Sequence, residues 1–146
     1  MSAQPLLKSQ AGNPKTVEEA RALVKYVESL FTPWNVDALV GGFVPDCVVR
    51  FGDLPEFRGH DALRTFFTAR SQRQKNYTLV KTLKALMNDT ICNTWEGQWE
   101  DSATGGKMAG FGCEVWLMRN GKIAVWEGAF NAAPVGSPGA MQSLLT

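Results

Sequence analysis

The stretch FGCEVWLMRNGKIAVWEGAFN, residues 111–131, decides the fold of this chain. Asn120-Gly121 separates two apolar segments. This dipeptide strongly indicates a β-hairpin, because both central residues of a type I′ turn need a positive φ. A two-residue turn there predicts that Arg119 pairs with Lys122. Since side chains alternate between the two faces of a strand, the turn also predicts which residues share a face.

Counting outward from this turn yields two faces of different chemistry. The first has no charge and places Val115 opposite Trp126; its members are Phe111, Cys113, Val115, Leu117, Ala124, Trp126, Gly128 and Phe130. The second face contains Glu114, Trp116, Glu127 and Asn131. Glu114 would lie opposite Glu127, and two opposed glutamates repel when buried. We therefore predict that the uncharged face points inward and the glutamate face outward.

A second hairpin is predicted around Asn88-Asp89. Counting from it, one face of the following strand points inward; its members are Ile91, Asn93, Trp95, Gly97 and Trp99. Lys84, on the preceding strand, would lie across from this face and also point inward. Gln98 and Glu96 would point outward, with Lys81 opposite Glu96. The orientation of the strand over residues 77–87 stays open.

The residues before these hairpins predict helices. Thr16 is expected to cap a first helix that Pro33 ends, and Asn35 to cap a second helix over residues 36–43. A strand over residues 47–52 follows, and a third helix begins at His60 or Asp61. Strands are then expected over residues 77–87, 91–99, 108–118 and 123–131. Helices before a meander of strands predict an α+β domain with the helices on one face of an antiparallel sheet.

Length and composition limit the functions open to the chain. Its 146 residues suit one domain over residues 16–133, with flexible segments at 1–15 and 134–146. A net charge of +1 argues against nucleic acid as a partner, and no apolar run is long enough to span a membrane. Three widely spaced cysteines favour a reducing, cytoplasmic compartment, and a single histidine, His60, argues against a histidine-based metal site. No cofactor is expected.

Large rings beside glycine on the inward faces predict a pocket rather than a filled core. Its expected walls are Trp34, Phe51, Trp95, Trp99, Phe111, Cys113, Val115, Trp126 and Phe130. Asn93 is expected to orient a ligand, and His60 or Tyr26 to transfer a proton. The outward residues Trp116, Glu114, Glu127 and Gln98 predict a dimer interface, because aromatic residues are enriched there.

Three stretches carry a resemblance to a known superfamily. They are PWNVDALVGGFVPDCVVRF (residues 33–51), FRGHDALRTFF (57–67) and the hairpin 111–131. Together they resemble the nuclear transport factor 2-like superfamily, which includes ketosteroid isomerases and SnoaL-like polyketide cyclases. The chain is most similar to an uncharacterised SnoaL-like branch that shares G-x-E-x-W, here residues 112–116. The resemblance implies a cone-shaped, curved sheet with three helices on its concave face (a cystatin-like α+β barrel), a pocket, and a homodimer through the outer face.

The resemblance also implies where catalytic groups of the isomerases would fall. The base position corresponds to Phe51 and the acid position to Cys113, while the helix tyrosine corresponds to Leu30, with Tyr26 one turn earlier. Two functions therefore stay open. One is a protein that binds a small apolar or aromatic molecule, acting, if an enzyme, as a cofactor-free lyase, isomerase or hydrolase. The alternative is a non-catalytic dimeric module that binds a ligand or a protein.

Overall fold

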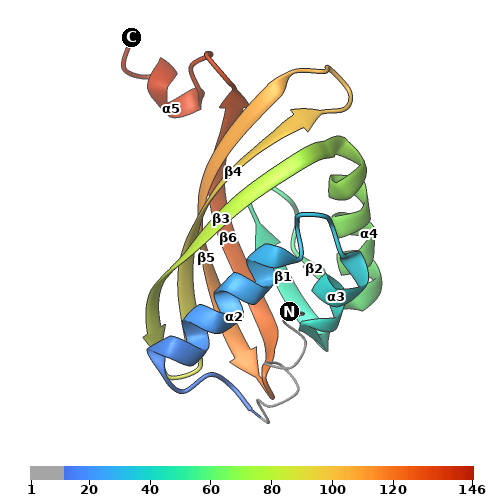
Figure 1. Ribbon diagram of the computed structural model, residues 1–146, viewed down its shortest axis with the longest axis vertical. Helices are drawn as coiled ribbons and strands as arrows, with labels where there is room; N and C mark the ends of the chain where they lie inside the picture. The colour runs from blue at the N-terminus through green and yellow to red at the C-terminus, as the bar shows by residue number, and fades with distance from the viewer. Residues whose placement is uncertain (1–11) are drawn as a thin grey trace.

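The computed structural model describes residues 12–146, which form an α+β fold (Figure 1). Along the chain the elements are α2 (Val17–Ser29), α3 (Val36–Gly41), β1 (Phe43–Phe51), β2 (Phe57–Arg58), α4 (Gly59–Arg73), β3 (Gln74–Met87), β4 (Thr90–Asp101), β5 (Lys107–Arg119), β6 (Lys122–Pro134) and α5 (Ala140–Ser143). The predicted three helices, first strand and four long strands are confirmed. The sequence did not predict β2 or α5, and α5 lies within the segment expected to be a flexible tail.

Local side-chain chemistry explains where the first helices begin. The hydroxyl of Thr16 accepts a hydrogen bond from the N–H of Glu19 at 3.1 Å, and the Asn35 side chain accepts one from the N–H of Ala38 at 3.0 Å. Both bonds satisfy N–H groups that have no partner within the helix. Helix α3 ends at Gly41, earlier than predicted, because Phe43 already belongs to β1.

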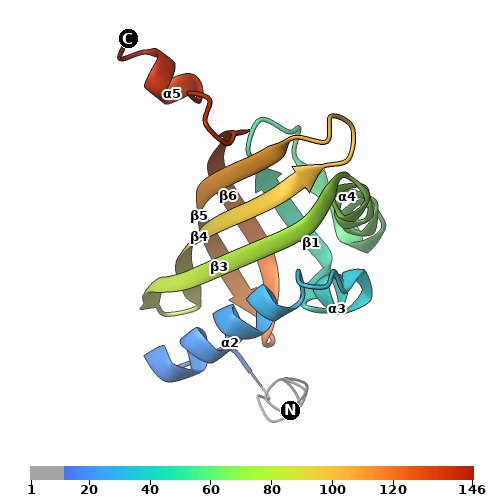
Figure 2. The same ribbon diagram turned by 45° about the horizontal axis from the view of Figure 1, so that its top comes forward.

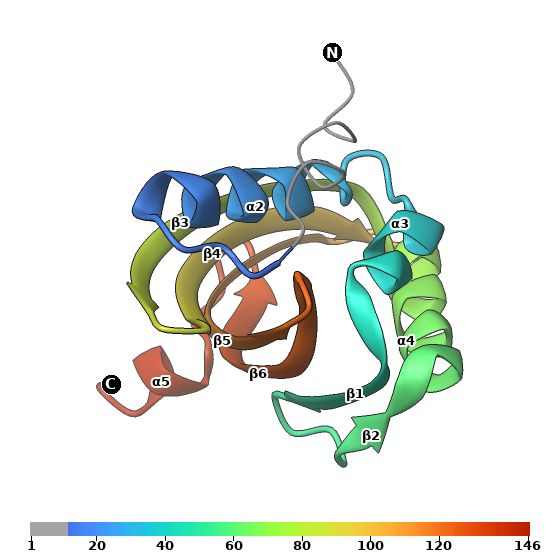
Figure 3. The same ribbon diagram turned by 90° about the horizontal axis from the view of Figure 1, so that it is seen from below.

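The six strands form one sheet in the order β2-β1-β6-β5-β4-β3. Strands β3 to β6 are an antiparallel meander, whereas β1 pairs with β6 in parallel. No hairpin joins β1 to β6, so nothing in their connection demands antiparallel pairing. Figures 2 and 3 show the sheet curling around an interior, with α2 along β3 and α4 beside β1. The predicted curved sheet with helices over its concave side is confirmed.

The hairpin between β5 and β6 has the predicted turn but not the predicted pairing. Asn120 and Gly121 have φ values of 53° and 75°, and Arg119 pairs with Lys122. A register shift then occurs between Leu117 and Met118, where β6 contains one extra residue. The extra residue is a β-bulge, and it changes the pairing of every residue beyond it by one position.

The bulge reverses the predicted orientation of β5. Trp116 pairs with Trp126 rather than with Val125, and both tryptophans are buried. The inward residues of β5 are therefore Gly112, Glu114, Trp116 and Met118. The predicted inward residues Phe111, Cys113, Val115 and Leu117 are exposed on the outer face, so their prediction was wrong. On β6, Trp126 points inward as expected and Glu127 is exposed.

Bulges also decide the orientation of β3. The inward face predicted for β4, which includes Asn93 and Trp95, is confirmed by its burial. A register shift between Leu83 and Ala85 in β3 places Lys81 opposite Trp95 and not opposite Glu96. Lys81 is consequently buried, at 2% exposure, while Lys84, expected to point inward, is exposed.

Asn13 connects the turns of the two long hairpins. Its amide nitrogen donates to Oδ1 of Asp89 at 2.9 Å and to the carbonyl of Met118 at 3.1 Å, and its oxygen accepts from the N–H of Gly121 at 2.8 Å. The segment predicted as a flexible arm lies outside the described residues up to residue 11. None of the helices within residues 12–146 is long and apolar enough to cross a bilayer.

Candidate functional site

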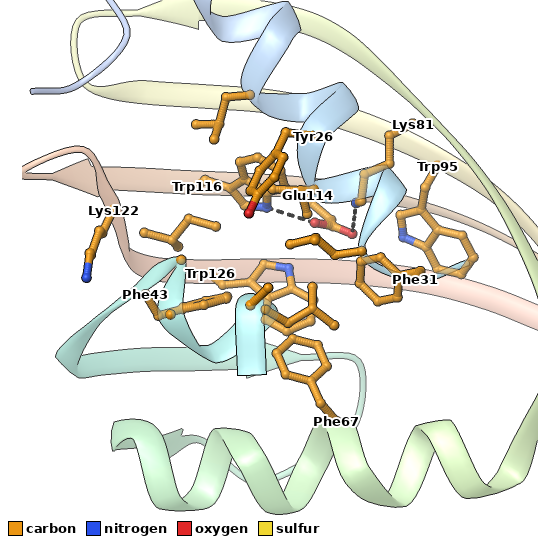
Figure 4. A pocket seen from close by; sticks show the side chains of 18 of the residues that line it. Tyr26, Phe31, Phe43, Phe67, Lys81, Trp95, Glu114, Trp116, Lys122 and Trp126 are labelled. Carbon is orange, nitrogen blue, oxygen red and sulfur yellow. Dashed lines mark hydrogen bonds and ion pairs between the residues drawn. The ribbon is translucent and has the colours of Figure 1, made fainter. Parts of the chain in front are cut away.

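A cavity of about 280 Å³ lies between the concave face of the sheet and the helices. Helix α2 contributes Tyr26, β1 contributes Phe51, and α4 contributes Phe67. Strands β3 to β6 supply the opposite wall, which includes Trp95 and Trp126 (Figure 4). Its lining comes from almost every element before the C-terminal segment, so only the complete fold creates it.

The apolar wall is centred on Trp126. Its ring lies 4.7 Å from that of Phe51 and 5.9 Å from that of Phe43, and it stacks on Phe67 at 5.8 Å with an interplanar angle of 17°. Gly128 makes room for this cluster, because a Cβ there would lie 2.7 Å from the Phe51 ring. The predicted arrangement of large rings beside missing side chains is thus present around Trp126.

Trp95 lies flat against β5 at a second glycine. A Cβ on Gly112 would lie only 2.4 Å from the indole nitrogen of Trp95 and 2.9 Å from the carbonyl of Ala129. Neither the ring nor the backbone leaves room for a side chain at this position. Gly112 therefore sets the position of the tryptophan that closes one side of the cavity.

The polar centre of the site is an ion pair between Lys81 on β3 and Glu114 on β5. Lys81 Nζ lies 2.7 Å from Glu114 Oε1, and the two side chains are 3% and 5% exposed. Lys81 also donates to Oδ1 of Asn93 at 3.2 Å, and the indole N–H of Trp116 donates to Glu114 Oε2 at 2.8 Å. These four residues come from three neighbouring strands and face one another across the sheet. Figure 4 shows Lys81 and Trp116 directed at the carboxylate.

Burial dominates the electrostatics of this centre. Removal from water lowers the pKa of Lys81 below its ordinary value, and the Glu114 carboxylate opposes that shift. Arg70, on α4, faces the same cavity; it also depresses the pKa of Lys81 by charge repulsion. Burial likewise raises the pKa of the Tyr77 phenol, whose oxygen lies 3.5 Å from an Arg70 nitrogen. A lysine held this way can exchange a proton more readily than one in water.

Of the three predicted catalytic residues, only Tyr26 lines the cavity. Asn93 does not line it and accepts a hydrogen bond from Lys81. His60 does not line the cavity; its Nε2 lies 2.8 Å from the carbonyl oxygen of Phe43, so it connects the start of α4 to β1. This hydrogen bond gives His60 a structural role that requires no part in proton transfer.

The predicted walls are also only partly brought together. Phe51, Trp95 and Trp126 line the cavity, whereas Trp34 and Trp99 pack against Tyr77 at its edge, with ring distances of 5.3 and 5.7 Å. Phe130 stacks on Phe51 at 5.1 Å but is 40% exposed. The outer face of β5 carries the remaining three predicted wall residues, Phe111, Cys113 and Val115.

Two of the four residues predicted for the dimer interface, Trp116 and Glu114, are not on the outer face, so their prediction was wrong. Trp116 and Glu114 are 1% and 5% exposed and face the cavity, so they cannot contact a partner. The correction has the same cause as the reversed face of β5, namely the bulge beside Leu117. Gln98 and Glu127 are exposed on the outer face, as expected.

Sequence reasoning missed Lys81, Glu114 and Arg70 as site residues. Glu114 was assigned outward because it was counted opposite Glu127, whereas its partner is Gly128. The G-x-E-x-W pattern held a usable signal, because it puts a glycine, an acid and an indole donor on one face of a strand. Within residues 12–146, no group of three or more His, Cys, Asp or Glu side chains is arranged to hold a metal.

Comparison with known proteins assigns the chain to a family. It belongs to the family described as "Protein of unknown function (DUF1348)", whose sequence model matches residues 13–138. Among the curated proteins, none matches the chain in sequence.

Solved structures show the same fold at low identity. SalBIII, an epoxide hydrolase/cyclase-like enzyme with a role in pyran ring formation in the polyether salinomycin, has a TM-score of 0.71 at 13% identity, over 80% of this chain and 96% of that one. A nuclear transport factor 2-like protein of unknown function from Burkholderia pseudomallei K96243 has a TM-score of 0.67 at 15% identity, over 76% and 89%. A ketosteroid isomerase-like protein from Erwinia carotovora atroseptica SCRI1043 has a TM-score of 0.64 at 19% identity, over 82% and 94%. The superfamily resemblance is thereby confirmed at the level of the fold.

Proposed function

We propose that this member of the DUF1348 family binds a small, largely apolar or aromatic molecule in its cavity and moves a proton on it without a cofactor. The reaction class would be that of an isomerase or lyase of the SnoaL-like kind. The observation that carries the proposal is the ion pair of Lys81 and Glu114, buried at 2.7 Å in a cavity walled by aromatic rings.

Stability alone gives no reason for such a pair. Desolvating two charges costs several kcal/mol per ion, and replacing a buried pair with apolar residues is often neutral or stabilising by about 1–4 kcal/mol. Most of the other residues that line the cavity around Lys81 and Glu114 are apolar. Charged groups held at such a position are typical of sites that act on a ligand.

The geometry suggests a role for each group. Glu114 uses one oxygen for Lys81 and the other for Trp116, yet a carboxylate has about four lone-pair sites, so acceptor capacity remains. We propose that Glu114 removes a proton from the carbon next to a carbonyl and returns it to a carbon further along. The Lys81 ammonium would donate to the carbonyl oxygen while it carries negative charge. Asn93 would hold Lys81 in position.

A small unsaturated ketone tests this chemistry directly. The conversion of 3-cyclohexenone to 2-cyclohexenone needs only such a proton transfer, and its conjugated product is followed by ultraviolet absorbance. We expect turnover by the unaltered protein and a loss of about 10²–10⁴-fold in Glu114→Gln. His60→Ala is the control and should retain activity, because His60, the single histidine of the chain, does not line the cavity.

The non-catalytic alternative has its own outcome in this experiment. Quenching of tryptophan fluorescence by the ketone, without any conversion, would indicate a binding protein and contradict proton transfer by Glu114. Absence of both quenching and conversion would count against the cavity as the site for this class of molecule.

We also propose that the chain forms a homodimer through the outer face of its sheet. Neighbouring strands expose apolar side chains there, with Val80 57%, Phe111 51%, Leu117 45% and Val115 38% exposed. Val80 and Phe111 lie in one row across the sheet, since both flank Glu96. Glu96 interrupts that row, whereas Phe111, Val115 and Leu117 share one face along β5; an apolar strip on a sheet face is typical of a protein interface.

A further inference from the structure

The charges facing the cavity do not balance. Of the described residues that line it, Glu114 is the only acid, whereas Arg70, Lys81 and Lys122 are cationic. Glu114 is already paired with Lys81. Lys122 follows the β5–β6 turn and is exposed to water. Arg70 is thus the one cation inside the cavity, within the described part of the chain, that lacks a carboxylate partner at ion-pair distance.

Arg70 is held by neutral groups. Its Nε donates to the Gln74 side chain at 2.8 Å, and a second guanidinium nitrogen lies 3.5 Å from the Tyr77 hydroxyl. Aromatic rings surround the guanidinium carbon at 5.3 to 5.8 Å; they belong to Phe31, Trp34, Phe51, Phe66 and Tyr77. An arginine stays protonated at neutral pH, so a full positive charge remains on this partly buried side chain among the rings. The charge of Glu114 acts on it from a distance, and an anion in direct contact would compensate it more completely.

The unpaired polar groups nearby are all donors. Buried N–H groups without an acceptor in residues 12–146 are the indole nitrogens of Trp34, Trp95 and Trp126 and the amide nitrogen of Asn93. Trp95 and Trp126 are 4% and 3% exposed and both line the cavity. Both indole nitrogens lie beside glycines of the sheet, Trp95 Nε1 next to Gly112 and Trp126 Nε1 next to Gly128. A ligand that satisfied these groups would have to supply acceptor oxygens.

We infer that the ligand carries a carboxylate on an aromatic or apolar body, and that Arg70 binds this carboxylate. The planar guanidinium fork matches a carboxylate and forms two parallel hydrogen bonds with it. The aromatic wall around Trp126 then receives the apolar body, and the Lys81–Glu114 pair faces the same molecule. This inference rests on the proposed use of the cavity and specifies the ligand class.

The competing explanation gives Arg70 a structural role. Cation–π contacts with the surrounding rings are worth about 0.5–2 kcal/mol and need no anion. The two explanations differ in what they predict for charged and neutral ligands of one shape. Stacking alone predicts no preference, because the guanidinium would not contact the ligand's polar group.

Calorimetric titration with 1-naphthoate and 1-naphthamide separates the two explanations, since the pair differs by one charge on the same ring. In the unaltered protein, naphthoate should bind at least tenfold more tightly than the amide. The preference should fall to about twofold or less in Arg70→Gln. Arg73→Gln is the control, because Arg73 lies on the same helix but pairs with Asp101 outside the cavity. It removes the same charge and should leave the preference unchanged.

Each other outcome is equally decisive. Equal affinity for both compounds in the unaltered protein would overturn the carboxylate inference while leaving the apolar cavity as the binding site. A preference that survives Arg70→Gln would overturn the assignment of the carboxylate to Arg70. Binding of neither compound would contradict both this inference and the proposed use of the cavity. Where Arg70→Gln does not fold, Arg70→Lys keeps the charge but loses the fork and should lower the preference severalfold.

Discussion

The two faces of β5 differ in a way opposite to that of an ordinary sheet strand. The inner face carries Glu114, buried against Lys81, while the outer face exposes Phe111, Val115 and Leu117 to solvent. An antiparallel strand covering a core usually points its apolar residues inward and its polar residues outward. Here an acid lies inside, beside Trp116 and Met118, and three apolar side chains lie outside.

Burial of apolar side chains alone does not explain the two faces of β5, so the function of the strand has also shaped its sequence. In the proposed function the inner acid supplies a charge in an apolar cavity, and in the proposed dimer a second chain covers the outer apolar groups. Changes on the two faces should therefore have different consequences. Inner changes should affect folding and ligand chemistry, whereas outer changes should affect assembly.

The largest effect is expected from Glu114→Gln on the inner face. It leaves Lys81 buried without its carboxylate, and breaking a buried pair in this way costs about 3–5 kcal/mol of unfolding free energy. Urea denaturation at pH 7 measures the loss. Glu127→Gln on the outer face is the control and should change stability by no more than about 0.5 kcal/mol.

The loss of unfolding free energy in Glu114→Gln should depend on pH. Burial already lowers the pKa of Lys81, and loss of the Glu114 carboxylate removes an opposing influence. Between the folded and unfolded pKa values of Lys81 the unfolded chain binds more protons, so stability rises with pH in that window. The deficit of Glu114→Gln should therefore shrink from pH 7 towards pH 9. A deficit that grows over this range would show that Lys81 does not lose its proton in the folded variant.

An intermediate effect is expected from Gly112→Ala on the same face. The added Cβ would meet the Trp95 ring at 2.4 Å and a backbone oxygen at 2.9 Å. Overpacking of this kind costs about 1–3 kcal/mol. It should also weaken binding of 1-naphthamide, because Trp95 must move within the cavity. Gly41→Ala, where a Cβ meets nothing within 4 Å, is the control; equal stability of the two variants would contradict this role for Gly112.

A smaller effect is expected when both charges are removed. Lys81→Met combined with Glu114→Met leaves no charge unpaired, so the free energy of unfolding should lie within about 1 kcal/mol of the unaltered protein, or above it. Turnover of 3-cyclohexenone should nevertheless be abolished. A double variant as unstable as Glu114→Gln would mean that the pair serves the fold and not the ligand.

The smallest effect on folding is expected from Phe111→Glu on the outer face. The residue is 51% exposed, so the monomer's stability should change by about 0.5 kcal/mol or less. Assembly should respond instead. Light scattering should give a dimer mass for the unaltered chain and a monomer mass for the variant. A monomeric unaltered protein at micromolar concentration, or a dimer that withstands the substitution, would argue against this interface.

Much of the fold was predictable because its signals are local. The cap at Thr16, the turn at Asn120-Gly121 and the inward face of β4 each depend on a few adjacent residues. The aromatic wall around Trp126 was also predictable, since its orientation on β6 agrees with the simple count. The polar site was not. A bulge in β3 turns Lys81 inward, and the unpredicted bulge between β5 and β6 made the count place Glu114 on the outer face.

The sequence by itself determined the order of the elements, the turns and the wealth of rings and glycines that makes a cavity possible. Only the tertiary structure decided which residues face that cavity. The physical reason is the two-residue period of a strand. One inserted residue in β6 moves the partner face of β5 from one side of the sheet to the other. That single insertion is the difference between Cys113 and Glu114 at the centre of the site.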